Sequence, residues 1–239
     1  MKKKSNTAIT LFLLYLCTEK NEVMQKQAGI IFDLDGVIID TEPIYDVFWS
    51  DAAIRYHVGI EHFERVIKGT TMPNIMERYF SGHTQQEREQ LIKECAEFEL
   101  KMPINPVSAA ISFLALLKEM DYKVALATSS ELHKLEYVFS VQPIRHFFDV
   151  IVTSERVKHG KPNPDCYLLA AAELGKEASE CLVFEDSLNG IKAANAAGAR
   201  VIGVTTSLSP DLLHDSTIDT IPDFRGVGID DINRWSKGM

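Results

Sequence analysis

Two carboxylates near the start of the chain are spaced so that both could act on one substrate. Asp33 and Asp35 come at the end of an apolar run, 29–33, and Gly36 follows them. The run is typical of a buried strand, and side chains two residues apart on an extended chain point the same way. Asp and Gly are also common in turns, so the pattern alone is equally typical of a solvated strand end.

Polar side chains also follow three later apolar runs. Thr128 and Ser129 come after the second run, Lys161 after the third, and Glu185 with Asp186 after the fourth. Carboxylates at two neighbouring strand ends indicate a hard cation held by oxygen, and Mg²⁺ is usual where phosphate is the other ligand. A hydroxyl group and a lysine suit the remaining phosphate oxygens. Together these strand ends predict a site for Mg²⁺ and phosphate.

Alternating strand and helix patterns must position these side chains. Strands are expected at 29–33, 123–128, 149–153, 181–185, 200–205 and 217–221, and helices at 109–120, 131–141, 164–174 and 189–197. This alternation predicts a parallel sheet with right-handed crossovers, in which ligands bind beyond the carboxyl ends of the strands. The expected fold class is α/β, with a doubly wound, Rossmann-like core.

One interval, 42–106, interrupts this alternation. It contains helical patterns only, at 45–56, 62–67, 74–80 and 84–101. Apolar residues on one of them fit one face of a helix. We therefore expect a small helical cap at 42–106, inserted into a catalytic core made of 28–41 and 107–239.

The composition is that of an ordinary globular protein. Of 239 residues, 46% are hydrophobic and 25% charged, and 34 acidic against 25 basic side chains give a formal charge of −9. An acidic chain with no Lys/Arg stripe lacks the charge pattern that nucleic-acid-binding proteins use, so we expect no nucleic-acid partner. We also expect the protein to be a monomer with no membrane partner. The four cysteines, which show no CxxC or ligand spacing, are expected to be thiols in a reducing compartment.

Residues 1–27 form an extension that we leave out of the fold. Lysines at 2–4 precede an apolar run at 8–17, which has the outline of a secretory signal. No small-x-small cleavage step follows, and the run is shorter than the roughly 20 residues that a membrane span needs. We prefer a start at Met24 and a cytoplasmic location. The alternatives are export through a genuine signal at 1–23, or an N-terminal helix.

Four segments, taken in order, resemble the motifs of the haloacid dehalogenase superfamily. They are 33–43 (DLDGVIIDTEP), 127–130 (ATSS), 160–165 (GKPNPD) and 183–198 (VFEDSLNGIKAANAAG). The helical interval lies where that family has its four-helix cap. The chain is similar to the β-phosphoglucomutase-like branch, which contains sugar phosphatases and mutases.

The resemblance implies phosphoryl transfer through an aspartyl phosphate. Asp33 would be the nucleophile, and Asp35 would protonate the leaving oxygen and then deprotonate water. We expect the like charge of Asp33 to keep a proton on Asp35, and the metal to keep Asp33 ionised. An acid at position 35 favours phosphoryl transfer over carbon–halogen cleavage, because a halide leaving group needs no proton.

The resemblance also implies the ligands. Mg²⁺ would bind oxygen atoms from two strand ends, namely Asp33, the Asp35 carbonyl, Asp186, and Glu185 directly or through water. The phosphate would lie among groups from three loops, namely Gly36, Thr128, Ser129 and Lys161. Candidates for contact with the rest of the substrate lie in one cap loop, at Lys68, Gly69 and Thr70.

Two positions favour a phosphatase over a mutase. β-Phosphoglucomutase has a histidine on the helix after the first motif and a cap-loop arginine that grips the distal phosphate, and at the matching positions this chain has Tyr45 and Met72. A bisphosphate intermediate needs cations at both ends, so we expect hydrolysis of a small sugar phosphate. A sugar phosphate mutase is the alternative. A non-catalytic sensor of the same fold would need a broken acid pair, and both pairs are intact.

Overall fold

A six-stranded parallel sheet forms the centre of the computed structural model, which describes residues 27–239 except the side chain of Glu42. The strand order is β3-β2-β1-β4-β5-β6, and all neighbouring pairs are parallel. The strands are Gly29–Phe32 (β1), Val124–Ala127 (β2), Val150–Val152 (β3), Cys181–Glu185 (β4), Arg200–Val204 (β5) and Asp219–Ile221 (β6). The chain therefore builds the sheet outward from β1 on one side and from β4 on the other.

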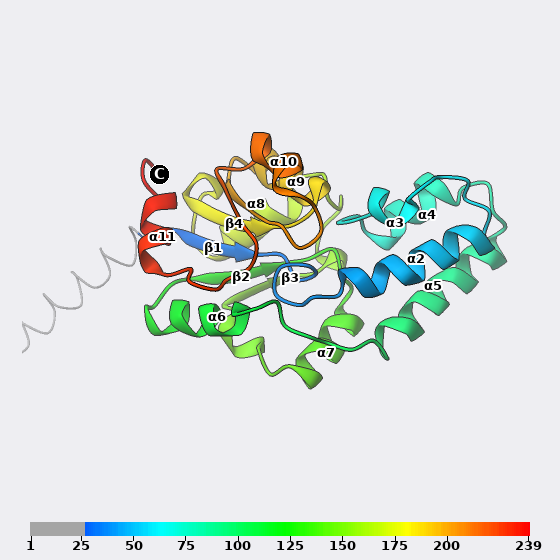
Figure 1. Cartoon of the computed structure of the whole chain (residues 1–239), viewed down its shortest axis with the longest axis horizontal. Helices are drawn as coiled ribbons and strands as arrows, with labels where there is room; N and C mark the ends of the chain where they lie inside the picture. Colours follow the sequence, from blue (N-terminus) through cyan, green and yellow to red (C-terminus); the bar gives the residue numbers. More distant parts are fainter. Residues whose placement is uncertain (1–26) are drawn as a thin grey trace, which may run out of the picture.

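Helices cover both faces of the sheet (Figure 1). One face carries α6 (Ala110–Glu119), α7 (Leu132–Val141) and α11 (Ile229–Trp235), and the other carries α8 (Asp165–Glu173), α9 (Leu188–Ala197) and α10 (Pro210–Leu213). Successive strand residues point to opposite faces, so Ile30 and Phe32 pack into the first layer and Ile31 into the second. Burial from both sides explains why these strands are apolar throughout.

Four short 3-10 helices lie in the loops of the core. They are Arg145–Phe147 (η1), Ser154–Arg156 (η2), Ala178–Glu180 (η3) and His214–Ser216 (η4). Each has three residues, the usual extent of this tighter helix. They connect the longer elements and leave the order of the sheet unchanged.

An aromatic cluster joins the sheet to the first helical layer. Phe32 of β1 and Phe184 of β4 stack with ring centroids 4.9 Å apart and planes 10° apart. Phe113 of α6 meets these two rings edge-on at 6.1 and 5.8 Å, and stacks on Phe224 at 5.3 Å. Because Phe32 and Phe184 each immediately precede a predicted site carboxylate, this cluster holds the two strand ends from which those carboxylates project.

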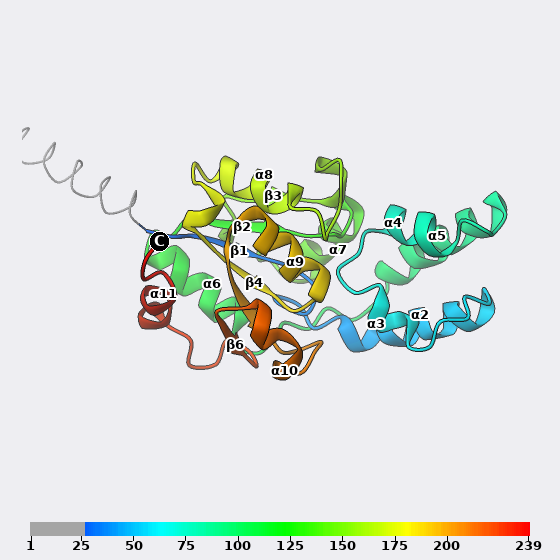
Figure 2. The same ribbon diagram turned by 90° about the horizontal axis from the view of Figure 1, so that it is seen from above.

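A smaller group of helices stands beyond the carboxyl edge of the sheet (Figure 2). It consists of α2 (Glu42–Arg55), α3 (Phe63–Val66), α4 (Met72–Tyr79) and α5 (Gln85–Glu99). These helices enclose a core of their own around Trp49, Phe63, Phe80 and Leu91, each at most 5% exposed. A separate apolar core lets the cap keep its shape beside the sheet.

The expected fold class, a doubly wound parallel sheet with an inserted helical cap, is confirmed. The apolar pattern does not predict α10, α11 or the 3-10 helices, because three to seven residues span too few turns to show a period. The domain boundaries stay predictions. The interpretations of residues 1–26 lie outside the described residues.

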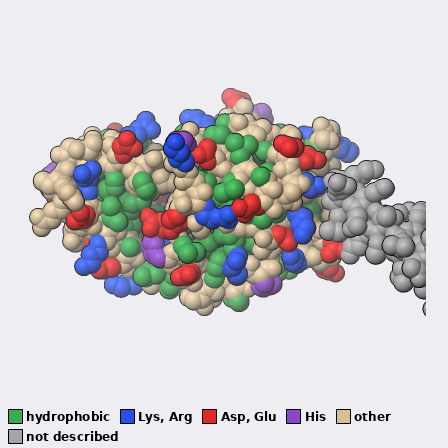
Figure 3. Space-filling model, turned by 180° about the vertical axis from the view of Figure 1, so that it is seen from behind, with side chains coloured by type: hydrophobic (Ala, Val, Ile, Leu, Met, Phe, Trp, Pro, Cys, Tyr) green, Lys and Arg blue, Asp and Glu red, His purple; other side chains and the backbone are tan. Residues whose placement is uncertain are grey.

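Other sequence expectations concern the surface and the thiols. Cys95, Cys166 and Cys181 are buried thiols, as expected, and Cys17 is not among the described residues. Within residues 27–239, no helix combines the length and apolar character needed to cross a membrane. On the face shown in Figure 3, Lys and Arg side chains lie among Asp and Glu side chains over both cap and core.

The aromatic cluster should carry a large share of the stability of the core. Phe113→Ala would leave a cavity against Phe32, Phe184 and Phe224, so we expect a loss of about 3–5 kcal/mol in the free energy of unfolding. Urea denaturation followed by circular dichroism measures it. The matched control is Leu168→Ala, at a leucine that is 45% exposed, where a change within about 0.5 kcal/mol is expected. Equal losses in both variants would contradict this account.

Candidate active site

The carboxyl ends of β1 and β4 bring three predicted site carboxylates together. The two strands are neighbours, and the Asp33 amide donates a hydrogen bond to the Phe184 carbonyl at 3.0 Å. The direction of winding changes between β1 and β4, which leaves the crevice where ligands of α/β sheets bind. Carboxylate oxygens of Asp33, Glu185 and Asp186 lie there within 4.8 Å of one another.

Lys161 is a buried cation between two of these carboxylates. Its Nζ donates to Asp33 Oδ1 at 2.9 Å and to Glu185 Oε1 at 2.7 Å, and its side chain is 1% exposed. Burial works to lower the pKa of Lys161, but Asp33 and Glu185 outweigh it and raise that pKa well above its usual range. Burial also raises the pKa of Asp33 to about 7, against the opposing effect of Lys161. Lys161 therefore stays charged at neutral pH.

Glu185 anchors this arrangement through both of its carboxylate oxygens. Oε1 accepts from Lys161 and, at 3.0 Å, from the Tyr167 hydroxyl. Oε2 accepts from the amides of Asp186 and Ser187, both at 2.8 Å, and from the Ser187 hydroxyl. A Cβ at Gly190 would lie 1.5 Å from Oε1, so only glycine leaves room for the carboxylate. These contacts fix Glu185 in one orientation.

The oxygen donors at this edge fit a hard divalent cation such as Mg²⁺. The three carboxylates are buried and converge. Gly36 has a φ of 71°, and a Cβ there would lie 2.0 Å from Asp186 Oδ2, so the turn after β1 packs directly against this carboxylate. Because N–H and O–H donors already engage both oxygens of Glu185, Asp33 and Asp186 are the better-placed pair for direct contact with an ion.

Asp35 lies in a different electrostatic environment from Asp33. Its Oδ2 accepts from Lys134 Nζ at 2.5 Å and from Ser130 Oγ at 2.8 Å, and its Oδ1 accepts from Thr41 Oγ1. Burial works to raise the pKa of Asp35, but the Lys134 charge and these three hydrogen bonds outweigh it. The pKa of Asp35 is therefore held below its usual range.

The expectation that Asp33 would keep a proton on Asp35 is wrong for this structure. That expectation considered the like charge of Asp33 but not Lys134, the cation that contacts Asp35. Lys134 is 1% exposed and pairs directly with Asp35, so it favours the ionised carboxylate. The pKa of Asp33 moves upward instead, because burial there outweighs the opposing effect of Lys161.

The loop after β2 directs its hydroxyl groups to different partners. Thr128 is 2% exposed, lines the same cavity as Asp33, and accepts a hydrogen bond from the Ser130 amide at 3.0 Å. Ser129 donates to the Gly69 carbonyl of the cap at 2.9 Å. The Ser129 hydroxyl thus holds the cap, and the phosphate-binding roles of both residues stay predictions.

The predicted cap loop docks on the core. Asn189 Nδ2 donates to the Lys68 carbonyl at 2.9 Å and to Thr70 Oγ1 at 3.0 Å. Gly69 has a φ of 70°, and a Cβ there would lie 2.2 Å from Ser187 Oγ, so this close approach requires glycine. The loop after β2 and the start of α9 therefore both hold the cap loop.

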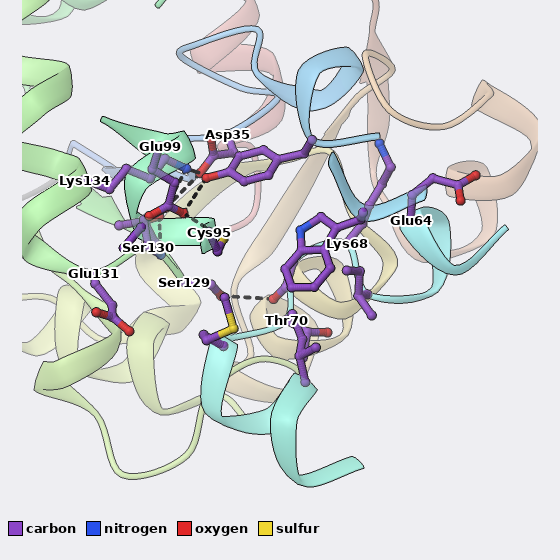
Figure 4. Close-up of a pocket in the computed structure, with 18 of the residues that line it drawn as sticks. Asp35, Glu64, Lys68, Thr70, Cys95, Glu99, Ser129, Ser130, Glu131 and Lys134 are labelled. Carbon is purple, nitrogen blue, oxygen red and sulfur yellow. Dashed lines mark hydrogen bonds and ion pairs between the residues drawn. The ribbon is translucent and has the colours of Figure 1, made fainter. Parts of the chain in front are cut away.

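A cavity lies between the cap and the carboxyl edge of the sheet. The core contributes Asp33, Asp35, Thr128, Lys134 and Asp186 to its wall, and the cap contributes Tyr45, Trp49, Glu64, Lys68, Met72 and Glu99, among others. Figure 4 shows Asp35, Lys134 and Ser130 gathered near Glu99, with Lys68 and Glu64 lying apart from them. A ligand in the cavity would reach the strand-end aspartates and the cap at once.

Sequence reasoning missed three residues of this region, namely Lys134, Tyr167 and Asn189. Lys134 comes four residues after Ser130, which lies two residues before α7 begins at Leu132. That spacing could have indicated that Lys134 lies near Ser130. A single lysine beside an apolar helical face is normally expected to be exposed, however. Tyr167 lies on the helix after the third motif and Asn189 within the fourth motif segment, and their contacts arise only from the packing of distant segments.

Comparison with known proteins gives a family and several relatives. Residues 30–204 match the family model described as haloacid dehalogenase-like hydrolase. The fructose-1-phosphate phosphatase of Escherichia coli (strain K12) is 31% identical over 186 residues, which are 75% of this chain and 97% of that protein. A phosphorylated carbohydrates phosphatase of Thermotoga maritima is 33% identical over 196 residues, 76% of this chain and 87% of that protein.

Solved structures agree in fold. A haloacid dehalogenase hydrolase from Entamoeba histolytica matches with a TM-score of 0.76 and 25% identity, over 89% of this chain and all of that one. A β-phosphoglucomutase from Clostridium difficile matches with a TM-score of 0.75 over 88% of this chain and 97% of that one, and at 22% identity it is similar in fold alone. The motifs, the sheet order and the family match agree. The chain belongs to the haloacid dehalogenase-like hydrolases.

Proposed function

We propose that the protein is a Mg²⁺-dependent phosphatase that hydrolyses a small sugar phosphate through an aspartyl-phosphate intermediate. The observation that carries this proposal is the convergence of Asp33, Lys161 and Asp186 at the change of winding direction beside β1 and β4. The printed names of the relatives support it, since they describe phosphatases of fructose 1-phosphate and of phosphorylated carbohydrates.

Asp33 carries the covalent chemistry in this proposal. One of its oxygens attacks phosphorus, the bond from phosphorus to the sugar oxygen breaks, and Asp35 gives that oxygen a proton. Water then attacks the phosphorus of the phosphoaspartate, and Asp35 takes the proton of the water. Free phosphate leaves, and Asp33 is restored.

The two states of Asp35 follow from its surroundings. The ionised form, which Lys134 favours, is the one that accepts a proton from water in the second step. The first step needs the protonated form, and the incoming phosphate favours it because a nearby negative charge raises the pKa of a carboxyl group.

Cations and donors around Asp33 hold the phosphate. Lys161 lies 2.9 Å from Asp33 and offers a permanent charge to an oxygen of the transferring group, and Thr128 offers a hydroxyl. Asp33 and Asp186 would hold Mg²⁺, with Glu185 acting through Lys161. When bound, the ion supplies positive charge that offsets the charge of the phosphate.

The cap restricts the access of water. Asn189 and Ser129 hold its loop against the core, so a substrate in the cavity lies between the aspartates and the cap side chains. Exclusion of bulk water strengthens the electrostatic contacts of the phosphate. Contacts of the substrate with Lys68, Gly69 and Thr70 are part of this proposal.

Two positions in the cavity favour hydrolysis over mutase chemistry. Tyr45 donates its hydroxyl to Glu99 at 2.6 Å, and Met72 is uncharged. Neither offers a cation to a second phosphate. A monomer, a cytoplasmic location and the absence of a nucleic-acid partner stay predictions.

The nucleophile can be tested directly. Asp33→Asn should lower the turnover of 4-nitrophenyl phosphate at least about 10³-fold, because an amide oxygen cannot form the phosphoaspartate. Asp211→Asn, at an exposed position of α10, is the matched control and should behave as wild type. Retained activity in Asp33→Asn would rule out the mechanism.

Removal of the metal gives a second test. Treatment with EDTA should stop phosphate release, and excess Mg²⁺ should restore it. Asp186→Asn removes one charged oxygen ligand, so at least about tenfold more Mg²⁺ should be needed for half-maximal activity. A wild-type enzyme indifferent to chelation would contradict the proposed metal site.

The products separate a phosphatase from a mutase. With β-glucose 1-phosphate, we expect glucose and inorganic phosphate, because the cavity offers no cation at the positions of Tyr45 and Met72. Phosphate release and glucose 6-phosphate are both measured by coupled assays. Clean conversion to glucose 6-phosphate, primed by the bisphosphate, would favour the mutase instead.

A further inference from the structure

A buried lysine in the active-site cavity has no place in the four motifs. Lys134 lies in the first turn of α7, lines the cavity, and is 1% exposed. Its Nζ contacts Asp35 Oδ2 at 2.5 Å and Ser130 Oγ at 2.9 Å, and lies 4.6 Å from the centre of the Tyr45 ring. Figure 4 shows Lys134, Ser130 and Asp35 linked in this way.

The burial of this ammonium group needs a specific reason. A buried charge is costly unless it is paired and hydrogen-bonded, and the next helix positions on the same side are apolar, since Leu135 and Val138 are at most 1% exposed. A leucine or methionine could fill this position without any pairing. The contacts that compensate the charge of Lys134 are those with Asp35, Ser130 and the Tyr45 ring.

The same contacts fix the carboxylate of Asp35. Thr41, at the start of the cap, occupies Oδ1, while Ser130 and Lys134 occupy Oδ2. Both oxygens are therefore held, one from the segment leading into the cap and the other from the core. Lys134 supplies the charged contact in this set, which is the strong kind of hydrogen bond.

Lys134 also completes the charge balance of the site. In their ionised forms Asp33, Asp35, Glu185 and Asp186 carry four negative charges, and Lys134 and Lys161 carry two positive ones, which leaves −2. A divalent cation brings the sum to zero. Among the described residues, Lys161 pairs with Asp33 and Glu185, and Lys134 is the cation that pairs with Asp35.

We propose that Lys134 is the positioning residue for Asp35: it holds that carboxylate in the orientation from which it exchanges protons with the substrate oxygen. This inference rests on the function proposed above. Lys134 acts through Asp35, so its removal should impair proton transfer by leaving the acid misoriented, and should not resemble a lost phosphate contact.

The test uses two nearly isosteric substrates, phenyl phosphate and 4-nitrophenyl phosphate. Phenoxide is a strong base with a conjugate pKa of about 10 and needs a proton on leaving, whereas 4-nitrophenoxide is a much weaker base. For an enzyme with a covalent intermediate, kcat/KM reports the first chemical step. Lys134→Met should therefore lower kcat/KM for phenyl phosphate at least about tenfold more than for 4-nitrophenyl phosphate.

The matched control is Lys118→Met, the same change at a surface lysine that also pairs with an aspartate, Asp149, at 3.5 Å. It should leave the ratio of the two kcat/KM values unchanged. Equal losses on both substrates in Lys134→Met, or no loss on either, would overturn the inference. If Lys134→Met does not fold, Lys134→Gln takes its place, because glutamine keeps a hydrogen-bond donor without the charge. Its kcat/KM should also fall more for phenyl phosphate than for 4-nitrophenyl phosphate, but by a smaller factor.

A double variant tests whether Lys134 acts through Asp35. In an Asp35→Asn background, Lys134→Met should change kcat/KM for phenyl phosphate less than about threefold, because the group it orients is already lost. Multiplicative losses would show an independent role and overturn the inference.

A crystal structure of Lys134→Met gives a readout that does not depend on activity. The Asp35 carboxylate should lose its single orientation, and an unchanged carboxylate would count against the inference. If instead wild-type enzyme releases no phosphate from either substrate, or Asp33→Asn keeps its activity, the proposed function fails while this structural test still applies.

Discussion

Burial of like charges at one edge of the sheet is the constraint on which the site depends. Asp33, Glu185 and Asp186 are nearly inaccessible, and their oxygens lie within 4.8 Å of one another. Such a cluster is stable only when cations and N–H donors compensate it. Lys161, the amides after β4 and the Tyr167 hydroxyl do so. The aromatic cluster around Phe32 and Phe184 holds the ends of β1 and β4 in place against the repulsion among these carboxylates.

The cap is tied to the same constraint. The chain leaves β1 through the turn that carries Asp35, and Thr41, just before α2, bonds to that aspartate. Across the cavity, Ser129 and Asn189 hold the Gly69 loop. The position of the cap is thus determined by groups adjacent to the strand-end motifs, so closure of the cavity and the arrangement of the aspartates depend on shared contacts.

The strands, the parallel arrangement of the sheet and the motif residues were predictable because each rests on patterns visible along the sequence. An apolar run that ends in a carboxylate is visible in one stretch of sequence. The contacts of Lys134 with Asp35, or of Tyr167 with Glu185, join residues 99 and 18 positions apart. Whether one lysine at the start of a helix faces solvent or a buried acid depends on how α7 packs, and no local pattern contains that information. The wrong protonation assignment for Asp35 followed from this omission.

The two lysines give the paired aspartates opposite behaviour although only one residue separates them. Asp33 shares Lys161 with Glu185, and burial raises its pKa to about 7, whereas Asp35 has Lys134 and two hydroxyl donors, which lower its pKa. Two titrating groups whose environments push their pKa values apart are suited to different chemical tasks. A divalent cation held by Asp33 would supply positive charge that favours the ionised form of this carboxylate. In the proposed mechanism the metal would thus prepare Asp33 as the nucleophile, and Lys134 would prepare Asp35 as the acid–base group.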